Sequence, residues 1–254
     1  MNKRPIEKDI RDANIYVFDN KHFDEYESNP SIFEPSRQKD IDKIVQRASL
    51  DGNNNILDIG CGTGNILRIA SNYFKNIHGI DVSANLLGEL KRRQNNMHLL
   101  VGEATYIPYK SSYFDMITMY GVLHHILNHR NVFNEVYRAL RNGGMLYIDH
   151  DPNYFFGRFY HIFYRIRYLN KHGFGTAVAD LSEYHHTRTG GLNPLEIKDA
   201  LLAIGFRSVE VHFRLTTNPN LPFGYKVIHT LLSLLSKIYP AKSLFTHFWI
   251  LARK

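Results

Sequence analysis

Short apolar runs alternate with longer amphipathic segments through the first 151 residues of the chain. Each run is rich in Ile, Leu, Val and Met, which is typical of strands buried on both faces of a sheet. The runs predict strands at 55–60, 77–82, 97–104, 114–122 and 144–150. The segments between them carry apolar residues at helical spacing and predict helices near 64–74, 83–95 and 130–141. Because strands that alternate with helices pair in parallel, the chain predicts an α/β fold with a doubly wound sheet.

The rhythm of strand and helix breaks after residue 151. The segment DPNY marks the end of the fifth strand and the start of a first insertion, and a helix then begins at Asn193-Pro194. We expect glycine to end two helices, at Asn142-Gly143-Gly144 and at Gly205. The remaining pattern predicts a strand at 207–214, a second insertion at 216–242 and a final strand at 244–252.

The composition narrows the classes of function. A chain of 254 residues with 44% hydrophobic content can bury the core of one domain. The formal net charge of +7 favours an anionic partner or a membrane surface, but the basic residues are scattered and form no long run. Cys61 is the sole cysteine, which rules out a disulfide framework. The charged N-terminal segment and the lack of a long apolar run predict a cytoplasmic protein.

A glycine-rich turn follows the first predicted strand, in the segment ILDIGCGTGN at 56–65. Glycine adopts backbone angles that are barred to other residues and lets a ligand approach the main chain. The spacing of Gly60, Gly62 and Gly64 differs from the dinucleotide fingerprint, which places its third glycine at the position of Asn65. Asp58 precedes the turn and would repel a pyrophosphate, whereas it would attract a cationic ligand.

Carboxylates end the first three predicted strands in succession. Asp58 is followed by Asp81, whose position at the end of the second strand suits hydrogen bonds from ribose hydroxyls. Glu103 ends the third strand, where it can frame an adenine beside Ala104. Three acidic groups at neighbouring strand ends suit a nucleoside that carries positive charge. S-adenosylmethionine, with its ammonium and sulfonium groups, has this chemistry.

The segments ILDIGCGTG, GIDVS, GEATYIPYKSSYFDMITMYGVLHHI and LRNGGMLYI together resemble the class I S-adenosylmethionine-dependent methyltransferases. Within that family, the chain most resembles the enzymes that act on quinones, sterols and other small molecules. The resemblance covers residues 50–151 closely and 193–210 more loosely. It implies a seven-stranded, mostly parallel sheet whose last strand is antiparallel, and residues 244–252 fit that place.

The resemblance also implies roles for single residues. Asp58 would serve the methionine ammonium, Asp81 the ribose, and Glu103 with Ala104 the adenine, where the family often has aspartate in place of Glu103. The expected cofactor site comprises Asp58, Gly60, Cys61, Gly62, Gly64, Asp81, Val82, Glu103, Ala104, Met119 and Tyr120. The alternatives are a helix cap at Asp58, a simple turn at Gly60 and a small buried filler at Cys61.

Histidines are the candidates for a general base. Methyl transfer is an in-line displacement, which needs a base only if the acceptor atom must lose a proton. We expect that base to be His124, His185 or His186, the alternative being histidines with structural hydrogen bonds. Because adjacent histidines cannot share one face of a strand, we expect at most one of each pair, His124-His125 and His185-His186, to point inward. We expect no metal site, because no carboxylate or thiolate stands near the histidines at metal-ligand spacing.

Three aromatic or apolar segments lie outside the predicted core. Residues 154–168 hold eight aromatic residues, which indicate a cap helix, the wall of an acceptor pocket or a base-stacking surface. The apolar stripe at 227–238 indicates a cap on the core or a helix in peripheral contact with a membrane. Near the N-terminus, aromatic residues predict either a lid over the cofactor or a packed helix without ligand contact. These are Tyr16, Phe18, Phe23 and Tyr26.

We therefore expect one methyltransferase domain over residues 1–254 with helical lid insertions. Its parts are an N-terminal lid (1–45), a cofactor-binding half (46–151), a first insertion (152–192), a core helix and strand (193–215), a second insertion (216–242) and a last strand (243–254). The expected reaction moves a methyl group from S-adenosylmethionine to an oxygen or carbon of a small apolar or aromatic acceptor. The alternatives are an RNA or protein methyltransferase, and a non-catalytic S-adenosylmethionine-binding protein; nucleic acid is disfavoured because no continuous basic stretch exists.

Overall fold

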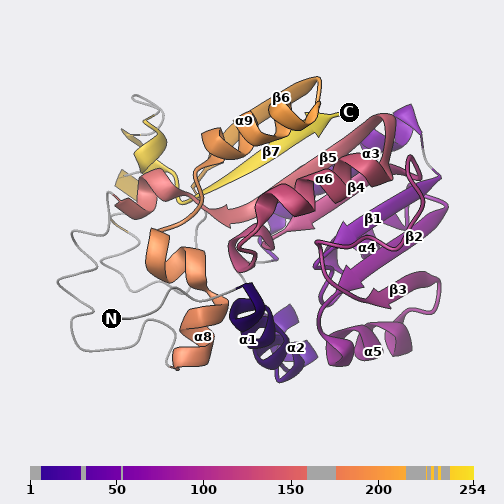
Figure 1. Cartoon of the computed structure of the whole chain (residues 1–254), viewed down its shortest axis with the longest axis horizontal. Coiled ribbons are helices and arrows are strands. Elements are labelled where there is room, and N and C mark those ends of the chain that lie inside the picture. The colour runs from indigo at the N-terminus through magenta and orange to yellow at the C-terminus, as the bar shows by residue number, and fades with distance from the viewer. Residues whose placement is uncertain are drawn as a thin grey trace.

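One sheet of seven strands organises the described part of the chain (Figure 1). The computed structural model describes residues 7–29, 33–52, 54–158, 176–215, 227, 230–231, 234–235 and 241–254. The strands are β1 (Asn55–Ile59), β2 (Asn76–Asp81), β3 (Met97–Val101), β4 (Phe114–Tyr120), β5 (Leu140–Pro152), β6 (Ser208–Arg214) and β7 (His247–Arg253). Their order is β3-β2-β1-β4-β5-β7-β6, and β7 runs antiparallel to both neighbours. The predicted doubly wound sheet and its antiparallel last strand are confirmed.

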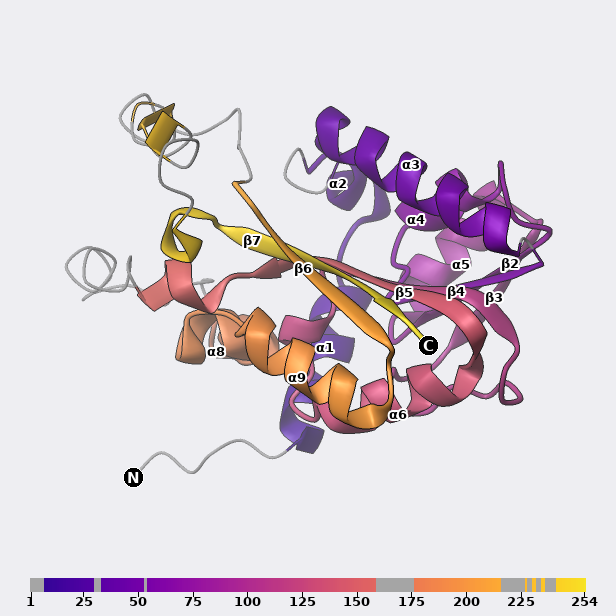
Figure 2. The ribbon, with the colours of Figure 1, turned by 90° about the horizontal axis from the view of Figure 1, so that it is seen from above.

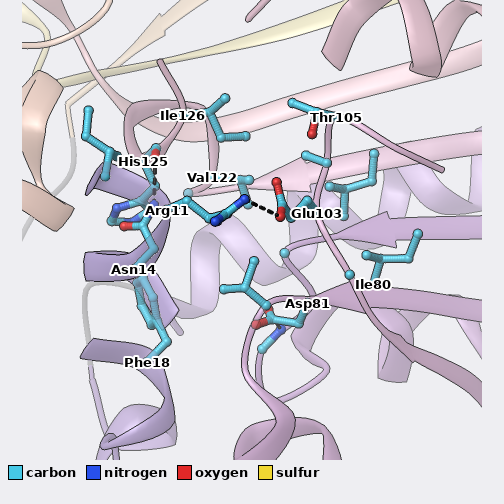
Figure 3. Close-up of a pocket in the computed structure, with 18 of the residues that line it drawn as sticks. Arg11, Asn14, Phe18, Ile80, Asp81, Glu103, Thr105, Val122, His125 and Ile126 are labelled. Atoms are coloured by element: carbon cyan, nitrogen blue, oxygen red, sulfur yellow. Dashed lines mark hydrogen bonds and ion pairs between the residues drawn. The ribbon is translucent and has the colours of Figure 1, made fainter. Parts of the chain in front are cut away.

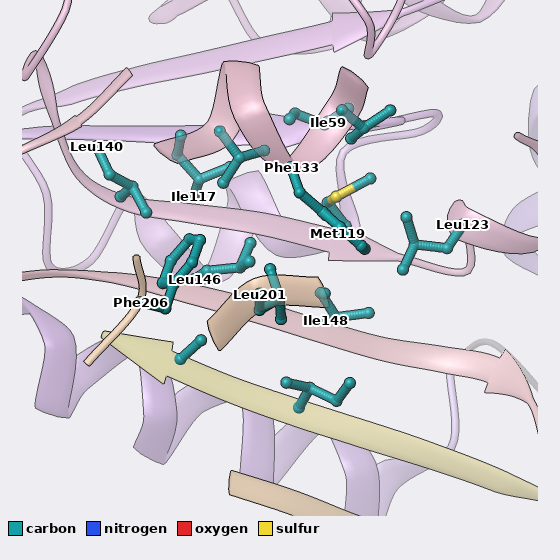
Figure 4. Packing of buried hydrophobic residues seen from close by; sticks show 14 of the residues in the cluster. Ile59, Ile117, Met119, Leu123, Phe133, Leu140, Leu146, Ile148, Leu201 and Phe206 are labelled. Atoms are coloured by element: carbon teal, nitrogen blue, oxygen red, sulfur yellow. The ribbon is translucent and has the colours of Figure 1, made fainter. Parts of the chain in front are cut away.

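Helices cover both faces of this sheet (Figure 2). One layer contains α3 (Pro35–Asp51), α4 (Asn65–Ala70) and α5 (Ala84–Arg93), and the other contains α6 (His129–Ala139) and α9 (Pro194–Ile204). Successive side chains of a strand point to opposite faces, so Ile56 packs in the first layer and Leu57 in the second. Figure 4 shows Phe133 of α6 and Leu201 of α9 packed against the side chains of β4 and β5.

Asn193 and Gly205 bound α9 as predicted. The Asn193 side chain accepts a hydrogen bond from the Leu195 amide, Pro194 occupies the first turn, and Gly205 follows with φ +123°. The expected helix end at Asn142-Gly143-Gly144 is wrong, because α6 already ends at Ala139. A Cβ on Gly144 would lie 2.9 Å from the Arg141 carbonyl oxygen, so glycine lets the strand bend past its own backbone there.

Further elements extend over the carboxyl ends of the strands. They are helices α1 (Glu7–Asp19), α2 (Phe23–Glu27) and α8 (Ala177–Ser182), and the short turns η1 (Leu123–His125), η2 (His185–Thr189) and η3 (Lys242–Leu244). Residues 154–158 are helical, whereas the rest of the aromatic segment lies outside the described residues. Most of the second insertion also lies outside them, so its cap and membrane alternatives stay predictions. Among the described residues, no helix has the length and apolar character needed to cross a membrane.

Candidate functional site

A cleft opens where β1, β2 and β4 end, with an empty volume of about 920 Å³ that includes the solvent at its mouth. Its floor comes from the turn after β1, the end of β2, residues 102–105 and residues 120–122. Helix α1 and the segment after η1 supply the opposite wall, as Figure 3 shows for Arg11, Asn14, Phe18, His125 and Ile126. The site therefore lies at the carboxyl edge of the sheet, where doubly wound folds bind their ligands.

The glycine turn is built for close backbone approach. Gly60, Gly62 and Gly64 all have positive φ, at +70°, +48° and +85°. A Cβ on Gly60 would lie 2.3 Å from Val122, and one on Gly64 would lie 2.8 Å from Leu90, so packing excludes larger residues at both positions. At Gly62 the nearest atom would be 3.8 Å away, on the Tyr26 ring. Gly62 therefore leaves the backbone open toward the cleft.

Asp81 presents a fixed carboxylate at the end of β2. Its Oδ2 accepts a hydrogen bond from the Gly62 amide at 2.8 Å, and its Oδ1 accepts one from the Ser83 amide, also at 2.8 Å. Burial raises the pKa of Asp81, and the backbone amides oppose that rise. The carboxylate thus ties the glycine turn to the next strand while it lines the cleft.

Asp58 lies behind the turn and does not line the cleft. Its side chain is only 2% exposed, and its Oδ1 accepts a hydrogen bond from the Thr118 hydroxyl at 2.6 Å. Burial raises the pKa of Asp58 to about 8; Thr118 opposes the rise, and the negative charge of Asp81 adds to it. A cationic ligand beside these two carboxyl groups would stabilise their charged forms.

The expected cofactor residues separate into two groups. Those that line the cleft are Gly60, Gly62, Asp81, Val82, Glu103, Ala104 and Tyr120. Those that lie behind it are Asp58, Cys61, Gly64 and Met119. Cys61 is 5% exposed and burial raises the pKa of its thiol, while Met119 belongs to the hydrophobic core. The second group can act on a ligand only through the backbone or through its charge.

Helix α1 forms a lid over the cleft and is held by hydrogen bonds at its middle and at its carboxyl end. The Asn14 amide donates to the His125 carbonyl oxygen at 2.7 Å, and the Ser182 hydroxyl donates to Asn14 Oδ1 at 2.8 Å. At the carboxyl end of α1, the Ser83 hydroxyl donates to Asp19 Oδ1 at 2.8 Å. Arg11 lies 3.4 Å from the Glu103 carboxylate across the mouth of the cleft.

Two of the four N-terminal aromatic residues face the cleft. Phe18 and Tyr26 line it, and burial raises the pKa of the Tyr26 hydroxyl, helped by the charge of Asp81. Phe23 instead packs into the core, and Tyr16 is 63% exposed. The aromatic lid interpretation therefore fits Phe18 and Tyr26 alone.

These residues fit S-adenosylmethionine. An open glycine, a fixed carboxylate at a β2 terminus and the Glu103-Ala104 wall surround one cleft. The two buried aspartates, whose pKa values are both raised by burial, favour a ligand with positive charge.

His124 and His125 both point into the protein, so the expectation that only one would is wrong. They lie on the turn η1 rather than on a strand, and their ring centroids are 3.9 Å apart. His124 Nδ1 donates to Asp151 Oδ1 at 2.8 Å, and its Nε2 lies 3.5 Å from Glu183 Oε2. His125 Nδ1 donates to the Ser182 carbonyl oxygen at 2.8 Å, and His125 lines the cleft.

The two neighbours have opposite pKa shifts. Burial lowers the pKa of His124, but the carboxylates of Asp151 and Glu183 outweigh it and raise the pKa overall. Burial and the charge of His124 lower the pKa of His125 to about 3. His125 is therefore neutral near pH 7, while the two carboxylates favour the protonated form of His124.

His185 and His186 are placed differently. His185 Nε2 donates to the Ile126 carbonyl oxygen at 3.0 Å, and burial lowers the His185 pKa to about 4. It lines a second cavity with His129 and Phe133, away from the cleft. His186 is exposed at the surface, and the charge of Glu183 opposes the lowering of its pKa by desolvation. Among the three predicted candidates, His124 is thus the one with a carboxylate partner at each ring nitrogen.

The sequence reasoning missed the carboxylates that complete this region. Asp151 and Glu183 lie 27 and 59 residues from His124 along the chain, and no local spacing connects them. The argument that the histidines lack carboxylate partners is therefore wrong. The sequence pattern also did not identify Asn14, because this residue belongs to no aromatic or charged pattern.

Comparison with known proteins agrees with this geometry. Residues 57–148 match the sequence model of a family described as "Methyltransferase domain". A demethylmenaquinone methyltransferase of Oceanobacillus iheyensis is 30% identical over 138 residues, which cover 51% of this chain and 58% of that protein. A malonyl-[acyl-carrier protein] O-methyltransferase of Enterobacter lignolyticus is 28% identical over 43% of this chain and 44% of its own length. The matches thus span less than two thirds of either relative.

Solved structures share the fold. A SAM-dependent methyltransferase from Archaeoglobus fulgidus superposes with a TM-score of 0.55 at 18% identity, covering 85% of this chain and 94% of that one. A possible histamine N-methyltransferase from Thermotoga maritima gives 0.56 at 18% identity, covering 95% and 99%. Residues 57–148 are thus similar in sequence to the methyltransferase domain family, and the sheet order gives the chain the fold of these S-adenosylmethionine-dependent methyltransferases.

Proposed function

We propose that this protein transfers a methyl group from S-adenosylmethionine to an oxygen or carbon of a small apolar or aromatic acceptor. The observation that carries the proposal is the cleft itself, in which the open Gly62 backbone, the Asp81 carboxylate and the Glu103-Ala104 wall converge. Asp81 would hold the ribose, Glu103 and Ala104 the adenine, and Asp58 would act on the ammonium through its charge.

When bound, the cofactor supplies an electrophilic methyl group on its sulfonium. The chain's own task is then to align an acceptor and to keep water out, since in-line displacement depends mainly on orientation. Helix α1 supplies the cover, because Asn14 ties it to both η1 and the end of α8. Phe18 and Tyr26 bring aromatic faces to the cleft, where they suit a cationic sulfonium.

The lining of the cleft supports an apolar acceptor. Beyond the expected cofactor residues, the wall includes Ile10, Phe18, Val122, Ile126 and Leu127. Apolar walls with a few convergent polar groups are typical of sites for small organic ligands. The activities after which several relatives are named support the same class, among them a ubiquinone biosynthesis O-methyltransferase of Candida albicans, 29% identical over 169 residues.

A proton that leaves an oxygen acceptor needs a receiving group at this end of the cleft. His125 borders the cleft, and His124 lies directly beside it between Asp151 and Glu183. His185, in contrast, donates to a backbone carbonyl and borders another cavity. The region of His124 is therefore the proposed place of deprotonation.

The test follows the methyl group. Purified protein is incubated with methyl-labelled S-adenosylmethionine and cell extract, and the products are separated into organic-soluble, water-soluble, RNA and protein fractions. Label should enter the organic-soluble fraction with the intact protein and be lost with Asp81→Ala. Glu210→Gln, which removes a 63% exposed carboxylate on β6, should match the intact protein. Label in RNA or protein, or in no fraction although the cofactor binds, would overturn the small-acceptor proposal.

A further inference from the structure

Two histidines and a glutamate converge beside the cleft. His124 and His125 lie on η1, and Glu183 follows the last residue of α8. One donor atom of each residue lies within 4.8 Å of the other two. His124 Nε2 and Glu183 Oε2 are 3.5 Å apart, near the roughly 3.4 Å that separates two ligands bound at about 2.1 Å to a tetrahedral ion. Among the described residues, this is the group of three that could hold a metal ion.

Both rings are oriented as metal-binding histidines usually are. Such a histidine commonly donates its second N–H to a carboxylate or a backbone carbonyl, which fixes the tautomer and the direction of the ring. Here the Nδ1 of His124 donates to Asp151, and the Nδ1 of His125 donates to the carbonyl oxygen of Ser182. The acceptors assign the proton to Nδ1 in each ring, which leaves Nε2 as the ligating nitrogen.

The charges around the cluster favour a cation. Asp151 is fully buried, and its Oδ2 has no hydrogen-bond partner in the described chain. Glu183 adds a second carboxylate, whose Oε2 lies 3.5 Å from His124 Nε2. The nearby ammonium of Lys21 lies over the Phe18 ring at 4.3 Å. A bound divalent ion would neutralise both carboxylates.

We propose that His124, His125 and Glu183 bind one divalent first-row transition metal ion, with Asp151 and Ser182 as the groups that orient the two rings. Two imidazoles and one carboxylate are a donor set that zinc and iron(II) sites use, and three protein ligands leave coordination positions open. The Glu183 side chain is 22% exposed and that of His124 is 12% exposed, so an ion has a route of entry.

A metal ion at this place would narrow the acceptor class of the proposed function, and this step rests on that proposed function. Because His125 lines the cleft, the open positions would face the acceptor, and an acceptor oxygen is the group that such an ion binds. The ion would lower the pKa of an acceptor hydroxyl, so that its proton would leave to solvent water and His124 would serve as a ligand. The acceptor oxygen would then form its bond to the methyl carbon as the bond from that carbon to sulfur breaks, and the cofactor would leave as a neutral thioether. The acceptor class narrows accordingly to molecules with a hydroxyl group.

Direct metal titration tests the site. Protein freed of metal with a chelator is titrated with Co²⁺, read by visible absorption, and with Zn²⁺, read by calorimetry. One ion per chain should bind, and the His125→Ala and Glu183→Gln variants should each lose at least about tenfold in affinity. Asp151→Asn removes an orienting group and should cost about ten- to hundredfold. His98→Gln, an exposed histidine on β3, serves as the matched control and should bind normally.

Circular dichroism of each variant establishes that it is folded. The proposal is overturned if the intact protein binds neither ion, or if the folded His125→Ala and Glu183→Gln variants bind as tightly as the intact protein. S-adenosylmethionine binding and methyl transfer are measured on the same samples. Cofactor binding and transfer without metal binding would sink only the metal site, whereas metal binding without methyl transfer would sink only the proposed function.

Discussion

The two ends of the cleft are built in different ways. At the cofactor end, Gly60, Gly62 and Asp81 come from one turn and the strand that follows it. At the other end, His124 and His125 meet Asp151 and Glu183, which arrive from the end of β5 and from α8. The first end is encoded by short-range spacing, whereas the second exists only when distant segments are folded together.

Helix α1 and the strand β5 connect these two ends. Asn14 bridges η1 and α8 while its helix covers the cofactor end. Asp149 and Asp151 lie near the end of β5, where the strand register shifts between them. Between them, His150 has a φ of +67°, a conformation that residues with side chains rarely adopt. The acceptor end thus depends on an irregular strand terminus that its surroundings must hold in place.

Breaking the support of that terminus should have the largest effect on stability. Arg37 of α3 donates to Asp149 Oδ1 at 2.9 Å, and both side chains are fully buried. Arg37→Met would leave the Asp149 carboxylate without its ion partner, at a cost of about 3–5 kcal/mol in the free energy of unfolding. Urea denaturation measures the loss. Arg92→Met, which removes an exposed pair with Glu89, should cost less than about 0.5 kcal/mol.

A comparable loss in both variants would mean that the buried pair does not stabilise the strand terminus. Equal loss of metal and cofactor binding in a folded Arg37→Met would show that the two ends are coupled through β5.

The glycine turn should be broken by one methyl group. Gly60→Ala places a Cβ 2.3 Å from Val122. The positive φ of +70° by itself costs an L-residue about 1–2 kcal/mol. We expect a loss of about a hundredfold in S-adenosylmethionine affinity by calorimetry, at the cofactor end alone. Gly88→Ala, on α5 with no atom near its Cβ, should leave affinity unchanged and stabilise the helix by about 0.5–1 kcal/mol.

Adding Val122→Ala to Gly60→Ala tests the cause of the loss. The second substitution removes the clash but leaves the strained φ, so affinity should return in part. Full affinity in Gly60→Ala by itself would show that the turn adapts and that its packing against Val122 is not essential.

Acid should lower the free energy of unfolding, because two buried neutral histidines resist protonation in the folded state. Burial and the charge of His98 lower the pKa of His78 to about 4, and His125 is lowered to about 3. Because the folded pKa lies below the unfolded value near 6.5, protons bind the unfolded chain preferentially. Stability should therefore be intact above about pH 6.5 and fall as the pH drops toward 4, by about 2 kcal/mol for each such histidine at pH 5.

His78→Leu separates the two contributions. His78 lies on β2, away from the acceptor end, so its removal should reduce acid destabilisation by about 2 kcal/mol without any change in metal binding. Urea denaturation at pH 7 and pH 5 measures the difference between this variant and the intact protein. An unchanged difference would mean that His78 accepts a proton in the folded state.

The cofactor end of the cleft could be predicted from the sequence far better than the acceptor end. The alternation of strands and helices, the glycine turn and Asp81 were all predictable, because each depends on residues a few positions apart. The position of Asp58 behind the turn was not predicted. Asp58 points to the same face of the sheet as Ile56, and this face does not line the cleft. Met119 is hidden in the core for the same kind of reason.

The residues of helix α1 that line the cleft could have been predicted from helical periodicity. Ile10, Asn14 and Phe18 line the cleft, and their spacing of four residues places them on one face of α1. Tyr16 has the right chemistry but lies off that face and is exposed. Glu183 gave no signal at all, because a single glutamate in an insertion becomes part of a cluster only through the contact of α8 with η1 and α1.

The smallest effect is expected at the mouth of the cleft. Arg11 and Glu103 are 3.4 Å apart with side chains 39% and 45% exposed, so water and salt screen their attraction. Arg11→Gln should weaken S-adenosylmethionine binding by no more than about fivefold at low salt, because one fastening of the lid is lost. The difference from the intact protein should vanish above about 0.5 M salt, where the screening length is only a few ångströms. Calorimetry across a salt series measures it, with Arg92→Gln as the control for a lost surface charge. Tighter binding in Arg11→Gln would show that Arg11 competes with the adenine for Glu103, and would make the lid an obstacle to the cofactor rather than a cover.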